Sequence, residues 1–67
     1  MNRLEINIKT DNAAFDDEAR GPELARILRR LADQFDNGDL PDADPWIIHD
    51  INGNRVGYAW HVEESDE

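Results

Sequence analysis

The chain has 67 residues, no cysteine and a formal net charge of −9 at neutral pH. This length permits one small domain, and the lack of cysteine excludes disulfides, thiolate zinc sites and cysteine nucleophiles. The N-terminal MNRLEINIKT has no apolar core of the kind found in signal peptides, and no long apolar run follows, so we expect a cytoplasmic protein without membrane spans.

The second half of the chain carries the whole net charge. Residues 1–30 contain six acidic and six basic side chains, whereas residues 31–67 contain ten acidic side chains and a single base, Arg55. Such a field repels nucleic acid and anionic membranes and attracts basic partners.

The first predicted element is a strand over residues 3–9, where Leu4, Ile6 and Ile8 alternate with polar side chains. A polar connection follows, and we expect Phe15 within it to pack back onto the core.

A helix is predicted next, from Pro22 to about Phe35. Proline suits the first helical turn, and Asn37 with Gly38 supplies a usual helix stop. The predicted apolar stripe of this helix consists of Leu24, Ile27, Leu28, Leu31 and Phe35.

The last elements are predicted strands at 46–51 and 55–62, joined by a type I′ turn within the sequence NGN. The pairing parity divides their side chains into the same two sets whichever two NGN residues form the turn. The first set is more apolar and is expected to face the helix: Ile47, His49, Ile51, Val56, Tyr58, Trp60 and Val62. The second set is expected to stay uncovered: Trp46, Ile48, Asp50, Arg55, Gly57, Ala59 and His61.

These elements predict an α+β domain of order β-α-β-β over residues 1–62, followed by an acidic tail at 63–67. One helix covers one face of a three-stranded antiparallel sheet in which the third strand is central. The uncovered face would carry Trp46, Ile48 and Ala59, a patch suited to a homodimer or a partner.

The clustered aspartates raise the question of metal binding, which the spacing disfavours. An EF-hand loop anchored at Gly53 puts Ile48 and Ala59 at its first and last ligand positions, and one anchored at Gly38 puts Phe35 at its third. We therefore predict no metal site and no cofactor.

Catalysis is also disfavoured. His49 is predicted beside Tyr58 at the edge of the core, while His61 falls on the opposite face and cannot join it. The one serine, Ser65, lies in the tail, so no nucleophile and base are brought together.

The basic side chains Arg26, Arg29 and Arg30 are interpreted as a solvated helix face, because Glu23 and Asp33 lie three or four positions away and would pair with them. Direct nucleic-acid binding would also act against the net charge.

The carboxylates themselves remain as a candidate surface. Alternate residues of an extended chain lie about 6.6 Å apart, close to two of the roughly 3.4 Å steps between phosphate charges along one DNA strand. The alternative is that they only keep a small protein soluble. The predicted partner-binding residues are Asp33, Asp36, Asp39, Asp42, Asp44, Trp46, Glu63 and Glu64, with Trp46 as an aromatic anchor.

Three stretches resemble a group of short proteins found in prophages and bacterial genomes: KTDNAAF at 9–15, ELARILRRLA at 23–32 and DINGNRVG at 50–57. This resemblance implies a phage origin and no enzymatic activity. In size and charge the chain is also similar to small acidic phage inhibitors of host defence, among them anti-CRISPR and anti-restriction proteins, several of which imitate DNA.

The leading hypothesis is a phage-encoded, non-enzymatic inhibitor that acts in the bacterial cytoplasm. Its acidic, DNA-mimicking surface would occupy a basic DNA-binding groove of a host defence complex. The alternative is a small homodimeric adaptor that associates through the uncovered sheet face.

Overall fold

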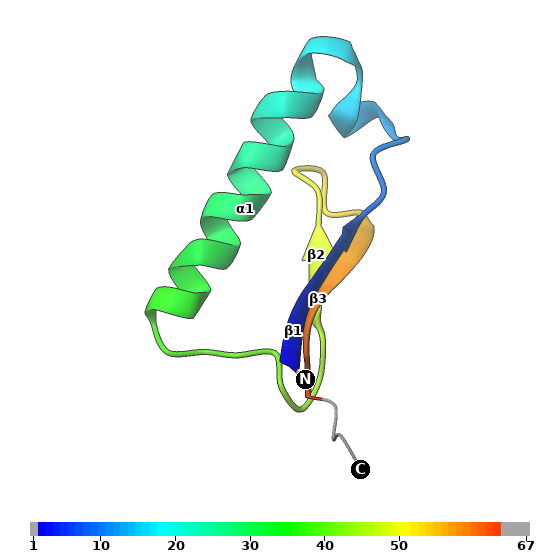
Figure 1. Cartoon of the computed structure of the whole chain (residues 1–67). Helices are drawn as coiled ribbons and strands as arrows, with labels where there is room; N and C mark the ends of the chain where they lie inside the picture. Colours follow the sequence, from blue (N-terminus) through cyan, green and yellow to red (C-terminus); the bar gives the residue numbers. More distant parts are fainter. Residues whose placement is uncertain (1, 64–67) are drawn as a thin grey trace.

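A three-stranded antiparallel sheet forms one layer of the protein (Figure 1). The computed structural model describes residues 2–63. The strands are β1 (Asn2–Ile8), β2 (Trp46–His49) and β3 (Arg55–Glu63), arranged in the order β1-β3-β2. The predicted α+β fold, with the third strand central, is confirmed.

The second layer is helix α1 (Arg20–Asp36), which lies on one face of the sheet. It begins at Arg20, so Pro22 lies in its first turn. Proline is tolerated there because the N–H groups of the first turn have no partner within the helix. Two short turns of 3-10 helix precede it, η1 (Ala13–Phe15) and η2 (Asp17–Ala19). No helix in the described part of the chain is long and apolar enough to cross a membrane.

The core lies where the middle of α1 and η1 meet the sheet. Phe15 is fully buried there, as predicted. The buried apolar side chains are Phe15, Ile27, Leu31, Ile48, Val56 and Ala59. Leu28 belongs to the predicted apolar stripe but is 47% exposed.

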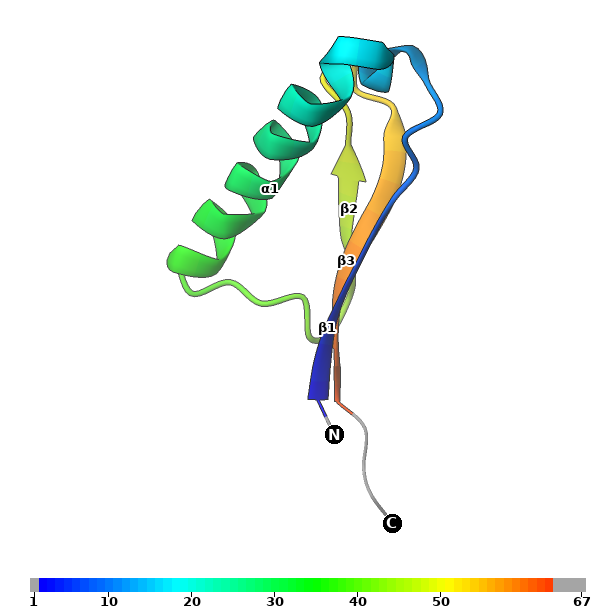
Figure 2. The same ribbon diagram turned by 45° about the horizontal axis from the view of Figure 1, so that its top comes forward.

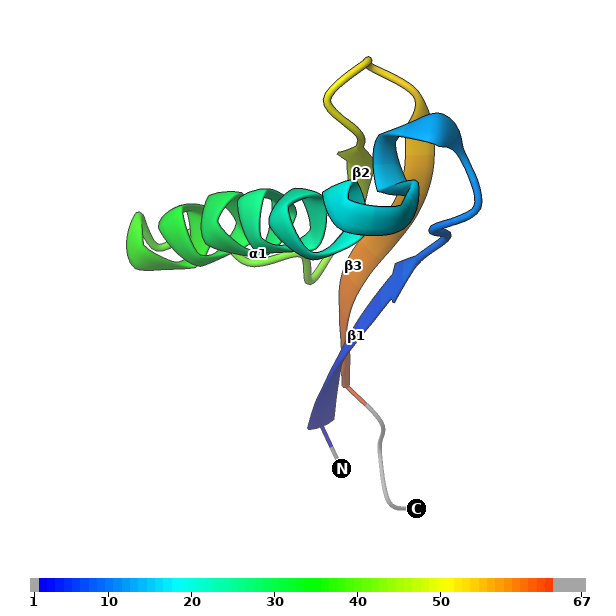
Figure 3. The same cartoon turned by 90° about the horizontal axis from the view of Figure 1, so that it is seen from above.

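Helix α1 diverges from the sheet toward its C-terminal end (Figure 2). Seen from above, it extends past β2 and away from β1 (Figure 3). Leu4 and Ile6 on β1 consequently remain 47% and 40% exposed, although they face the same side of the sheet as the core.

The helix covers the opposite side of the β2–β3 hairpin from the side that the sequence predicted. Ile48 and Ala59 are 4% and 0% exposed, and Trp46 packs against the core. Ile47 and Trp60, expected beneath the helix, are each 40% exposed. The predicted homodimer patch of Trp46, Ile48 and Ala59 is therefore wrong, because these side chains belong to the core.

The helix does not take the side of the hairpin that carries more apolar residues. The buried side chains of the two strands are Ile48, Val56 and Ala59, and they share the core with Ile27 and Leu31 of α1. A count of apolar residues favoured the other face, but large apolar side chains are common at protein surfaces, so the count alone does not decide.

A β-bulge moves Val56 from the set in which the sequence placed it to the set that faces the helix. Trp46 to Ile48 pair with Ala59 to Gly57, as the predicted parity requires, but His49 pairs with Arg55. The extra residue, Val56, is 4% exposed and belongs to the core.

The face of the sheet away from α1 has no second layer in the described structure (Figure 2). We call it the open face. Its apolar side chains are Ile47, Tyr58, Trp60 and Val62, and its β1 residues are Arg3, Glu5 and Asn7. His49, predicted at the edge of the core, is exposed.

The hairpin turn is longer than the predicted type I′ turn. Only Gly53 has a positive φ in this loop (85°), whereas a type I′ turn requires two such residues. The Asp50 carboxylate accepts bonds from the N–H groups of Asn52 (2.9 Å) and Asn54 (2.8 Å). It also accepts a bond from the side-chain amide of Asn12 (2.9 Å), so it ties the hairpin to the segment before α1.

A buried carboxylate ties α1 to the same hairpin. Glu23 is 6% exposed and accepts hydrogen bonds from Arg26 (2.7 and 2.8 Å) and from the Ile51 N–H (2.8 Å). The bond from Arg26, opposed by burial and supported by the Ile51 N–H, holds the pKa of Glu23 below its usual value.

Candidate acidic interaction surface

Five predicted site residues lie on one continuous stretch, residues 33–44, which we call the acidic segment. It comprises the last turn of α1 and the first part of the connection to β2 (Figure 1). Asp33, Asp36, Asp39, Asp42 and Asp44 are all exposed.

The start of the acidic segment is fixed by the end of the helix. The Gly38 N–H donates to the Phe35 carbonyl (2.9 Å), and the Asp39 N–H donates to the Gln34 carbonyl (3.2 Å). Gly38 has a φ of 89°. This is a Schellman motif, and it gives the chain a defined direction as it leaves α1.

The acidic segment is fixed a second time against the sheet. Pro41 is fully buried, and its carbonyl accepts a hydrogen bond from the His61 N–H on β3 (3.1 Å). The next residue, Asp42, lies with Oδ1 2.8 Å from His61 Nδ1. The carboxylates are therefore displayed by a segment held at its helix end and at Pro41.

Few of these charges are neutralised within the described structure. Within residues 2–63, Asp42 contacts the ring of His61. Asp33 forms no ion pair with Arg29 or Arg30 in this range, so the predicted pairing on the helix face is wrong at that position. Arg26 does pair with Glu23 as predicted. The other carboxylates of the segment, on Asp36, Asp39 and Asp44, also face solvent without an ion-pair partner in this range.

Two of the acids occupy positions that weaken the helix. Asp33 and Asp36 lie in the last turn of α1, which contains no basic side chain. The C-terminal end of a helix carries a partial negative charge, so a carboxylate there is unfavourable.

We expect Asp33→Asn/Asp36→Asn to stabilise the protein by about 0.5–1 kcal/mol, because the substitution removes two carboxylates from the negative end of the helix dipole. Urea unfolding followed by circular dichroism measures the change. Glu18→Gln is the matched control with the opposite sign, since Glu18 lies beside the start of α1. A fall in stability of the double variant would contradict the dipole argument.

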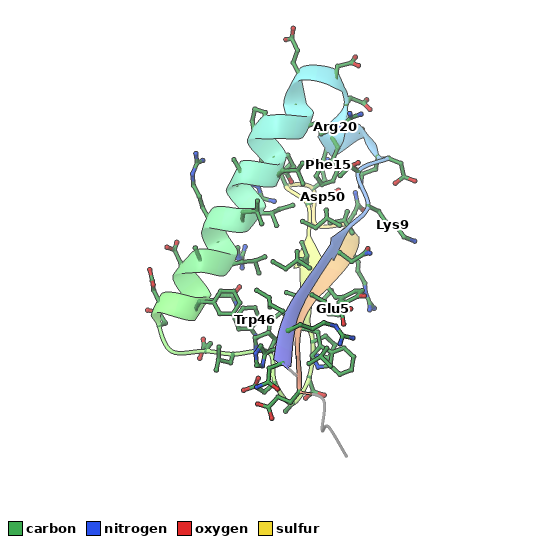
Figure 4. All side chains as sticks on the ribbon, viewed as in Figure 1. Glu5, Lys9, Phe15, Arg20, Trp46 and Asp50 are labelled. Atoms are coloured by element: carbon green, nitrogen blue, oxygen red, sulfur yellow. The ribbon has the colours of Figure 1, made fainter. Side chains whose placement is uncertain are left out.

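Trp46 is not the free aromatic anchor that the sequence predicted. Its ring lies 5.0 Å from that of Phe35, centroid to centroid, and packs at the edge of the core. Figure 4 shows Trp46 directed into the space between the end of α1 and the sheet. The exposed tryptophan is Trp60, on the open face.

The end of β3 brings further acidic groups to the acidic segment. Glu63 is exposed, and its carboxylate lies within 4.8 Å of the ligand atoms of both Asp42 and His61. Sequence reasoning did not connect these three residues, because 19 positions separate Asp42 from His61. Glu64, the last predicted site residue, lies outside the described residues.

A groove between α1 and β2 is lined by Arg26, Arg30, His49 and Asp50 among other residues, and two of these charged groups are already engaged. Ile27, Leu31 and Ile48 contribute apolar walls. Arg26 is bound to Glu23, and Asp50 to backbone and asparagine donors.

No family model, curated protein or solved structure matches this chain. The acidic surface must therefore be interpreted from its own geometry.

Proposed function

We propose that this chain is a phage-encoded, non-enzymatic inhibitor of a host DNA-binding defence complex, of the anti-CRISPR or anti-restriction type, acting in the bacterial cytoplasm. The acidic segment, with Glu63 at its side, takes the place of DNA phosphates in a basic groove of the target.

The observation that carries the proposal is the run of exposed aspartates on a segment fixed at two points, of which only Asp42 has a side-chain partner within residues 2–63. A fixed segment loses little conformational freedom on binding, so more of the electrostatic attraction is available as affinity. Proteins that grip DNA with Lys and Arg bind phosphate charges regularly spaced along the strand. Carboxylates held on one ridge are the form of anion that such a groove would accept.

Two further features support this direction. The net charge of −9 is concentrated beyond residue 30, which speeds encounter with a basic surface at low ionic strength. The resemblance of three sequence stretches to prophage-borne proteins supplies the biological setting, in which inhibition of host defence has a clear use.

The test is a competition assay in which the protein displaces duplex DNA from purified CRISPR surveillance and restriction complexes at two salt concentrations. Asp36, Asp39, Asp42 and Asp44 are changed together to Asn. We expect the variant to lose displacement by at least about tenfold, and higher salt to weaken the wild type, because ionic contacts are screened.

A charge-matched control comes from the other end of the molecule. Asp11→Asn/Asp16→Asn/Asp17→Asn/Glu18→Gln removes the same four charges away from the acidic segment. Circular dichroism confirms that both variants fold. Equal loss of displacement in the two variants would reduce the proposal to a general charge effect, and unaltered displacement in the acidic-segment variant would reject it.

The open face favours a second candidate, a homodimeric adaptor. Ile47 and Trp60 are each 40% exposed on this face. Ile47 on β2 pairs with Tyr58 on β3, and Trp60 lies two residues further along β3. Sedimentation of the wild type tests this second candidate, since a monomer at micromolar concentration would count against the adaptor and leave the inhibitor unaffected.

A further inference from the structure

We propose that Asp42, His61 and Glu63 form a binding site for a divalent transition-metal ion such as Zn²⁺. The proposal does not depend on the proposed inhibitory function. It contradicts the expectation of no metal site, which rested on the spacing of calcium loops.

The distances between the ligand atoms suit a single ion. One ligand atom from each side chain lies within 4.8 Å of the other two, and His61 Nδ1 lies 2.8 Å from Asp42 Oδ1. Two donors bound to one zinc ion at about 2.0–2.2 Å lie roughly 3–3.5 Å apart. The His61–Asp42 pair is already close to this separation, and Glu63 has to approach by a small rotation of a flexible side chain.

The backbone holds the three residues together before any ion arrives. His61 and Glu63 are alternate residues of β3 and so project from the same face of the sheet. Asp42 reaches them from the acidic segment, because the buried Pro41 accepts a hydrogen bond from the His61 N–H. Two separate segments therefore converge on one point.

The donor set selects the class of metal. An imidazole nitrogen suits Zn²⁺, Ni²⁺, Co²⁺ and Cu²⁺, whereas Mg²⁺ and Ca²⁺ prefer an all-oxygen shell. Two carboxylates neutralise the charge of a divalent ion, and His61 lends the nitrogen that distinguishes this cluster from an ordinary acidic surface. All three side chains are at least partly exposed, so water completes the coordination shell.

A bound ion would join the acidic segment to the end of β3. It replaces the direct contact between Asp42 and His61 with a bond from each side chain to the ion, and Glu63, two residues after His61 on β3, supplies a third. The expected consequence is a rise in thermal stability when metal is added, since an ion that binds only the folded state stabilises it.

The experiment is titration of the wild-type chain with ZnCl₂, NiCl₂, MgCl₂ and CaCl₂ in a non-coordinating buffer, followed by calorimetry and by thermal melting. We expect one Zn²⁺ or Ni²⁺ per chain, a shift of the His61 ring signals in NMR spectra, and clearly weaker binding of Mg²⁺ and Ca²⁺. His61→Gln, Asp42→Asn and Glu63→Gln should each weaken Zn²⁺ binding by about tenfold or more, as losses around metal sites do.

His49→Gln is the matched control, because His49 is an exposed histidine on β2 that lies outside the cluster. It should leave Zn²⁺ affinity unchanged. Several ions bound per chain with equal affinity for Zn²⁺ and Ca²⁺ would show only condensation onto a polyanion and overturn the proposal. Equal losses in His49→Gln and His61→Gln would overturn it as well.

Discussion

Gly57→Ala is expected to detach β1 from the sheet. A Cβ atom added at Gly57 would overlap the backbone carbonyl oxygen of Asn7 and lie 2.8 Å from its carbon. Backbone atoms cannot rotate away as the end of a side chain does, so β1 has to move and lose its pairing with β3. Overpacking of a core costs about 1–3 kcal/mol and sometimes more, a large part of the roughly 3–5 kcal/mol that a core of this size supplies.

Urea unfolding measures the loss of stability, and amide hydrogen exchange locates it, because the β1 amides should lose protection before those of α1. Gly21→Ala is the matched control. A Cβ atom there meets nothing within 4 Å, and Gly21 lies in the first turn of α1. It should raise stability by up to about 1 kcal/mol through the better helix propensity of alanine. A Gly57→Ala protein with the wild-type urea midpoint would show that β1 can move to admit the new methyl group without a loss of stability.

The order and type of the elements could be predicted because the local signals agree with the fold. Alternation around Ile6 predicted β1, a stripe at helical spacing predicted α1, and Asn37 with Gly38 predicted its end. The side of the hairpin that packs against α1 could not be predicted in this way. It depends on contacts between residues far apart in the sequence, such as Ile27 and Leu31 with Ile48 and Ala59, which a count of apolar side chains on each face does not contain.

The candidate site was predicted in part. The exposure of the aspartates between 33 and 44 follows from their charge, and the fixed helix end follows from Gly38. The anchoring at Pro41 and the meeting of Asp42 with His61 and Glu63 depend on contacts between distant segments. Their only local signals were the proline itself and the alternation of His61 and Glu63 along one strand. The packing of Trp46 against Phe35 at the end of the helix could not be predicted either, because the two residues lie in different elements.

Asp50→Ala is expected to be the most damaging change of a polar residue. Asp50 is 4% exposed, and its carboxylate accepts bonds from two N–H groups of the hairpin loop and from the side-chain amides of Asn12 and Asn54. Figure 4 places Asp50 with Phe15 where the hairpin meets the segment before α1. Removing the carboxylate leaves these donors without their acceptor, which costs about 1–3 kcal/mol for each buried group that finds no water. We expect the variant to be largely unfolded at room temperature.

Asp50→Asn keeps the shape and one acceptor oxygen and should fall between Asp50→Ala and the wild type. Asp44→Asn, at an exposed aspartate without an ion-pair partner in residues 2–63, should change the urea midpoint little. A midpoint of Asp50→Ala equal to that of Asp44→Asn would show that the loop is closed without the carboxylate.

The same carboxylate makes stability depend on pH in a known direction. Burial acts to raise the pKa of Asp50, but hydrogen bonds from the Asn54 and Asn52 N–H groups and from two asparagine side chains outweigh it and hold the pKa below its usual value. The folded state therefore binds this proton less readily than the unfolded state does. Its contribution to stability is fully present above about pH 5 and is lost as pH falls below about 4, the usual range of aspartate. In Asp50→Asn the group cannot titrate, so the slope of stability against pH in this range should be smaller than in the wild type. Equal slopes would mean that other carboxylates, Glu23 first among them, carry the acid sensitivity, since Arg26 lowers the pKa of Glu23 in the same sense.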